Sequence, residues 1–141
     1  MAKISSFREL EVWQMAMELV IDCYTATERL PAGERFGLVR EIRRSAVSIP
    51  SNIAEGHNRH STNAYLNHVN IALGSHAELD CQLEIAVRLN YLRSSDLVEV
   101  VERVTRVGQM LHGLQRSLDS HKRDVMRLAL LTAVLGGLLL S

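Results

Sequence analysis

The chain has 141 residues, of which 47% are hydrophobic, 23% are charged and 4% are aromatic, and its formal net charge is zero. This length favours a single domain, and the composition is that of a globular protein rather than a disordered chain. The low counts of proline and glycine argue against an all-β fold, and the low aromatic content argues against stacking of nucleic-acid bases on a sheet.

The first predicted helix begins near Ser6. Ser6 and Glu9 have the spacing of a capping box, in which side chains satisfy free backbone amides at a helix start. The helical pattern ends at residues 30–33, where Pro31 cannot continue a helix. The apolar positions that define this helix are Leu10, Trp13, Met17, Val20, Ile21 and Tyr24.

The second helix is predicted over residues 35–55. Pro50 lies inside it and is expected to kink it, because proline lacks the amide hydrogen that would bind the carbonyl of Ala46. Gly56 follows and is expected to end the helix in a left-handed conformation. The apolar positions of this helix are Leu38, Val39, Ile42, Ala46, Ile49 and Ile53.

Two further helices follow. The third is predicted from Ser61, an N-cap candidate, to about Leu89, and the fourth is expected to be capped by Ser94 or Ser95. Four amphipathic helices with short connections predict an all-α fold, an antiparallel up-down-up-down four-helix bundle over residues 1–122.

Residues 123–141 form an apolar extension. Residues 128–140 carry no charge, but this run is shorter than the roughly 17–25 residues that span a bilayer. The favoured interpretation is a helical segment that packs on the bundle or on a neighbouring subunit and stabilises the assembly. A membrane-associating tail and a frayed extension are the alternatives, and no membrane partner is predicted.

No catalytic motif is present in the sequence. Glu-x-x-His pairs, phosphate-binding loops and nucleophile elbows are all absent, so no enzyme, cofactor or metal site is expected. His57 and His60 flank a helix junction without a carboxylate or thiol partner nearby in sequence. Cys23 and Cys81 are predicted to be free thiols, and the N-terminal sequence has no apolar signal-peptide core, so the expected compartment is the cytoplasm.

Polar residues interrupt the apolar faces of the second and third helices. One interpretation is a buried acid–base pair between Glu55 and Glu78, and the favoured one is a hydrogen-bond network that sets the register of the two helices. The two rows are Ser48, Asn52 and Glu55 in the second helix, and Ser75, Glu78 and Gln82 in the third.

Charge alternates along the chain in four blocks. Residues 1–28 and 60–102 are acidic, whereas residues 29–59 and 103–141 are basic. The favoured explanation is complementary packing of neighbouring helices, and the alternative is a basic face for a polyanion. The candidate phosphate-facing residues are Arg40, Arg43 and Arg44, which share one helix face, together with Arg35 and Arg59 nearby.

Three segments carry a resemblance to a known family: residues 7–14 (FRELEVWQ), residues 42–56 (IRRSAVSIPSNIAEG) and residues 71–79 (IALGSHAEL). They resemble the four-helix-bundle proteins encoded in intervening sequences of bacterial 23S ribosomal RNA genes. The accessory variability proteins of diversity-generating retroelements are similar. The matching signature positions are Arg43, Arg44, Ser48, Pro50, Ser51, Asn52, Glu55 and Gly56.

The resemblance implies a small bacterial bundle that assembles as a homopentamer, without an established catalytic activity. It also implies nucleic acid, or a protein that handles nucleic acid, as a partner. We therefore expect a non-enzymatic oligomer that serves as a structural or adaptor module. The alternative is weak, sequence-tolerant RNA or DNA binding through the basic face of the second helix.

Overall fold

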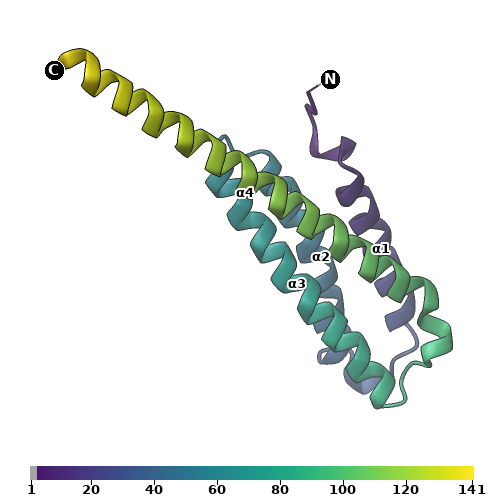
Figure 1. Ribbon diagram of the computed structural model, residues 1–141. Coiled ribbons are helices and arrows are strands. Elements are labelled where there is room, and N and C mark those ends of the chain that lie inside the picture. The colour runs from purple at the N-terminus through teal and green to yellow at the C-terminus, as the bar shows by residue number, and fades with distance from the viewer. Residues whose placement is uncertain (1–2) are drawn as a thin grey trace.

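The computed structural model describes residues 3–141, and every regular element in that span is helical. Figure 1 shows four long helices side by side, with α4 projecting far beyond the other three. The all-α four-helix prediction is confirmed. The elements are η1 (Phe7–Glu9), α1 (Glu11–Thr27), η2 (Ala32–Glu34), α2 (Leu38–His57), α3 (Thr62–Arg88), η3 (Ser94–Leu97) and α4 (Val98–Leu140).

The capping box at the start of the chain is confirmed, but it caps a 3₁₀ turn rather than α1. The Ser6 hydroxyl accepts from the Arg8 amide at 3.2 Å, and the Glu9 carboxylate accepts from the Ser6 amide at 3.2 Å. Leu10 is extended and separates this turn from α1. The predicted helix start near Ser6 is therefore wrong, because the capped segment closes as a separate 3₁₀ turn.

The buried face of α1 differs from the predicted one. Met17, Ile21 and Tyr24 are exposed, although the apolar pattern placed them in the core. Leu10, Trp13 and Val20 are only partly buried, at the edge of the core. The residues that α1 buries recur every three or four positions: Val12, Ala16, Leu19, Cys23 and Thr27.

The predicted left-handed cap at Gly56 is wrong. Gly56 lies inside α2, and none of the glycines in residues 3–141 has a positive φ. A Cβ atom at this position would lie 2.9 Å from the Cβ of His68 and 3.0 Å from the ring of Tyr65. The glycine therefore allows α2 and α3 to approach closely. The left-handed residue of the described chain is Asn90, which follows α3.

The other helix boundaries are set by local contacts. Ser61 caps α3 as predicted, since its hydroxyl accepts from the Ala64 amide at 3.3 Å. α2 begins at Leu38, whose amide donates to the Glu34 carboxylate at 2.9 Å, and the helix continues through Pro50. Ser94 and Ser95 do not cap α4, because they lie within η3, which directly precedes it.

The core lies where the four helices face one another. The predicted apolar face of α2 is buried as expected, with Ile42, Ala46, Ile49 and Ile53 fully enclosed. Leu79 of α3 and Leu111 of α4 are buried in the same core. Burial of such side chains stabilises the fold by about 1.5–3 kcal/mol each.

Residues 120–140 of α4, which we call the α4 overhang, continue the helix without a break. Every residue in the overhang except Gly136 is exposed. Packing of this segment on its own bundle is therefore not observed, and packing on a neighbouring subunit stays a prediction. No helix in residues 3–141 combines the length and the apolar character needed to cross a bilayer.

Candidate functional site

The structure gathers four of the five predicted phosphate-facing arginines around one surface hollow near the start of α2. Arg59 lies instead beyond the far end of α2, so the structure does not bring it to this place. We call this feature the arginine hollow; it is lined by Tyr24, Arg35, Phe36, Val39, Arg40, Arg43, Arg44 and Val47.

Arg43 is a packing residue that joins α2 to α1. Its Nε donates to the hydroxyl of Thr27 at 2.9 Å, and Thr27 is buried. Its guanidinium also lies 4.4 Å from the ring centroid of Tyr24. A guanidinium held over an aromatic face in this way is stabilised by the ring quadrupole. The guanidinium of Arg43 is therefore already engaged by Thr27 and Tyr24 of its own chain.

The guanidinium of Arg44 forms ion pairs with two carboxylates. It lies 3.1 Å from Glu41 on the same helix and 3.3 Å from Glu78 on α3. The hydrogen bond that Arg44 donates to Glu41 is the main reason that the pKa of Arg44 is raised, and the charges of Glu41 and Glu78 add to the effect. The neighbouring carboxylates neutralise much of the charge that Arg44 could offer to a phosphate.

Arg35 and Arg40 are the free cations of the arginine hollow. Neither makes an ion pair with a carboxylate in the described part of the chain, and both are exposed. Arg35 lies 5.4 Å from the ring centroid of Phe36, and Phe36 is 79% exposed. The hollow thus combines two available guanidinium groups with an aromatic ring that is open to a partner.

The polar rows of α2 and α3 form a hydrogen-bond network. The Ser48 and Ser75 hydroxyls lie 2.8 Å apart, and the Asn52 side-chain amide donates to the Ser48 carbonyl at 2.9 Å. The other end of the Asn52 side chain meets Nδ1 of His68 at 3.0 Å. This chain of contacts supports the interpretation that the polar residues set the register between the two helices.

The two carboxylates of these rows have separate partners. Glu55 binds Arg59 at 2.6 Å, whereas Glu78 binds Arg44 and the Ser45 hydroxyl. The hydrogen bond from Arg59 is the main cause that lowers the pKa of Glu55. Both carboxylates are more than half exposed, so the structure does not bring them together as a buried acid–base pair.

The remaining signature residues are structural. Pro50 and Gly56 are buried in α2, and the Ser51 hydroxyl donates to the Val47 carbonyl at 2.8 Å. Gln82 does not join the network, since its Oε1 is buried without a hydrogen-bond partner in residues 3–141.

His68 and Thr27 were missed by the sequence analysis. The sequence gives only a weak indication of either contact. His68 follows Asn52 by 16 residues, with a short helix connection between them, and Thr27 continues the row of α1 residues that is buried in the core. Neither spacing indicates a hydrogen bond until the helix pairing is known.

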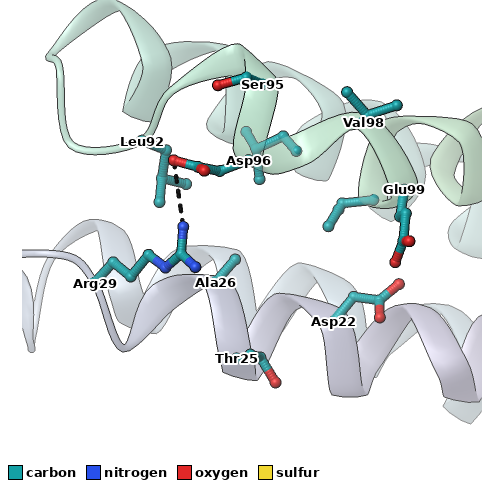
Figure 2. Close-up of a pocket in the computed structure, with 11 residues that line it drawn as sticks. Asp22, Thr25, Ala26, Arg29, Leu92, Ser95, Asp96, Val98 and Glu99 are labelled. Carbon is teal, nitrogen blue, oxygen red and sulfur yellow. Dashed lines mark ion pairs between the residues drawn. The ribbon is translucent and has the colours of Figure 1, made fainter.

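A second pocket lies between the end of α1 and the start of α4, and sequence reasoning did not identify it. Figure 2 shows Asp22, Arg29, Asp96 and Glu99 around it, with an ion pair of 3.3 Å between Arg29 and Asp96. Asp22 is also paired with Arg103. Within residues 3–141 no group of three or more histidine, cysteine or acidic residues is placed to hold a metal ion.

Comparisons with known proteins agree with this architecture. The family model described as 23S rRNA-intervening sequence protein matches residues 8–113. No curated protein matches the chain. A solved structure of a protein with unknown function from the S23 ribosomal protein family of Bacteroides thetaiotaomicron is similar with a TM-score of 0.66 and 23% identity, over 74% of this chain and 97% of that chain. The matched span covers most of the bundle and ends within α4, and the chain belongs to the 23S rRNA-intervening sequence protein family.

Proposed function

We propose that this chain is a non-enzymatic adaptor module that acts as a homo-oligomer, with five copies as the expected number. The observation that carries the proposal is apolar surface that the single chain leaves uncovered on the bundle. Phe36 is 79% exposed, Ile21 58% and Val98 55%. Ile21 lies on α1, Val98 begins α4 and Phe36 lies just before α2. Large exposed apolar side chains of this kind support a surface that another protein covers when they form one patch in the assembly.

Multi-angle light scattering of the full chain at micromolar concentration tests this proposal. A closed oligomer is expected, and its mass should fall when Ile21→Glu and Phe36→Glu are combined, because burying the new charges in an interface is unfavourable. Thr105→Glu combined with Asn67→Glu is the matched control, since it adds the same two charges at exposed polar positions of α4 and α3. A monomer mass for the unchanged chain would refute the proposal.

Phosphate-backbone binding at the arginine hollow is the second candidate function. Arg35 and Arg40 support it, because both are exposed and free of carboxylate partners in the described residues while Phe36 lies open beside them. Contacts of this kind recognise phosphates rather than base sequence. Several copies in one oligomer would add weak contacts into useful avidity.

Fluorescence anisotropy with a labelled single-stranded RNA tests this second function. For two phosphate contacts per site, affinity should fall about sevenfold for a fourfold rise in salt. The double variant Arg35→Ala, Arg40→Ala should abolish most of the binding. Arg43 is kept, because its loss would also disturb the contact with Thr27.

The control for the RNA experiment is Arg106→Ala combined with Arg116→Ala. This variant removes the same charge from exposed positions of α4. Equal loss of affinity in both double variants would show that only overall charge matters, and would count against a site at the hollow.

A further inference from the structure

The α4 overhang is a helix without a partner in its own chain. α4 has 43 residues, whereas α3 has 27, so the last turns of α4 extend past the end of the bundle, as Figure 1 shows. Most helical stability in proteins comes from packing of an apolar face against other elements. The overhang has no such packing within its own chain.

The overhang has one face rich in leucine. Leu128, Leu131, Leu135 and Leu138 follow the i, i+3, i+7, i+10 spacing of a heptad seam, and each is about 60% exposed or more. We call these four residues the leucine seam. Outside the seam, residues 128–140 include five small residues, Ala129, Thr132, Ala133, Gly136 and Gly137, and four further exposed apolar residues, Leu130, Val134, Leu139 and Leu140.

The seam lies on a different side of α4 from the bundle core. The residues of α4 that are buried in the core include Val104, Val107 and Leu111. At 3.6 residues per turn, the four seam leucines are rotated by about 100° or more from Leu111 around the helix axis. The seam is therefore turned away from its own bundle and is open to a partner outside it.

We infer that the leucine seam packs against the leucine seam of a second copy of this chain, in a short coiled coil outside the bundle. Apolar residues repeated at both seam positions are the pattern that such pairing uses. The seam is free of like-charge repulsion, since residues 128–140 carry no charge. The two preceding seam positions are His121 and Asp124, which limits the pairing to the apolar end of the overhang.

The area available suits an interface between copies. A leucine side chain that passes from exposed to buried removes on the order of 100 Å² of apolar surface from water. Val134 and Leu139 flank the seam and are also exposed, so two copies together would bury on the order of 1,000 Å². This is near the lower limit for a specific interface, so the overhang would act together with contacts of the bundle.

A lipid surface fits the overhang less well than a second copy does. A helix that lies in a membrane interface needs a strongly polar face opposite its apolar face. Opposite the seam the overhang carries alanine and glycine instead, with no charged residue from 128 to 140. The pattern is therefore that of a helix packed side to side with another helix.

Light scattering of full-length variants tests the inference. Leu131→Lys combined with Leu135→Lys places two charges on the seam, whereas Ala129→Lys combined with Ala133→Lys places them on the other side of the same turns. The seam variant should lose a factor of about two or more in oligomer mass, because a seam contact joins at least two copies. The control variant should keep the mass of the unchanged chain, and dilute samples of all three should show the same thermal unfolding of the bundle.

The outcomes separate this inference from the adaptor proposal. An oligomer whose mass is the same in the seam variant would overturn the inference and leave the adaptor proposal standing. A seam variant that becomes monomeric would support the inference and show that contacts of the bundle do not hold the copies together without the overhang. Flotation of the unchanged chain with vesicles of phosphatidylcholine and phosphatidylglycerol, abolished by the seam variant, would overturn the inference in favour of a membrane.

Discussion

Among single residues, Glu9 and Cys23 show most clearly how surroundings change side-chain chemistry. The amides of Ser6 and Ser5 donate to the Glu9 carboxylate, and these hydrogen bonds lower the pKa of Glu9 below its ordinary value of 4.5. Cys23 is buried in the core, and burial raises the pKa of its thiol to about 12. Cys23 is therefore a neutral packing residue at physiological pH, whereas Cys81 is exposed.

Glu9→Gln should reduce the pH dependence of stability. Because the folded-state pKa of Glu9 is lowered, its carboxylate stabilises the fold above about pH 4.5, and this contribution is lost as the pH falls through the folded-state value. The melting temperature, followed by circular dichroism from pH 7 to pH 3, should differ between the two proteins at neutral pH and converge in acid. A constant difference over the whole range would contradict this role, and Glu18→Gln, at an exposed position, is the control.

Among the elements, the α2–α3 pair depends on close approach of the two backbones. Gly56 provides the space for Tyr65 and His68, while the network from Ser48 to His68 pairs the side chains of Ser48, Ser75, Asn52 and His68 with one another. A polar network that is fully paired fixes the register of two helices, because a shift would leave buried groups without partners.

Gly56→Ala should destabilise the bundle by about 1–3 kcal/mol, because the new methyl group would press on the Cβ of His68 and on the ring of Tyr65. Gly74→Ala is the matched control in α3, since nothing lies within 4 Å of a Cβ atom there. The control should be neutral or stabilising by up to about 1 kcal/mol, as alanine favours helix. Urea unfolding measures both changes, and equal effects would show that the Gly56 contact is not needed.

For the whole molecule, the alternating charge blocks correspond to complementary packing. Arg29 pairs with Asp96, Arg44 with Glu78, and Arg103 with Asp22, and each pair joins a basic block to an acidic one. These pairs link the turn after α1 to η3, α2 to α3, and α4 to α1. Surface ion pairs of this kind contribute about 0–1 kcal/mol each to the free energy of unfolding. They therefore favour this arrangement of the helices without being a main source of its stability.

Truncation after Arg123 should leave the bundle folded and change its assembly. The overhang is exposed along its length, so its removal deletes no core contact of its own chain. We expect unfolding of dilute samples at an unchanged temperature, together with a lower oligomer mass at high concentration. Circular dichroism and light scattering measure the two quantities, and a large loss of melting temperature in dilute solution would contradict the independence of the bundle.

The sequence by itself determined the features that depend on residues a few positions apart. The capping residues Ser6 and Ser61 and the apolar face of α2 were predicted correctly, because short-range hydrogen bonds and helical periodicity produce them. The family resemblance was also carried by local segments, and the family match over residues 8–113 confirms it.

Only the tertiary structure decided the features that depend on contacts between distant residues. Gly56 looked like a helix end, but the approach of α3 keeps it inside α2. Arg43 looked free to bind phosphate, but Thr27 and Tyr24 of α1 hold it. The α4 overhang looked like a separate packed segment, and the structure shows it continuous and exposed, because the other three helices end before it begins. A helix pattern shows which side of a helix is apolar, whereas what lies against that side depends on where the rest of the chain folds.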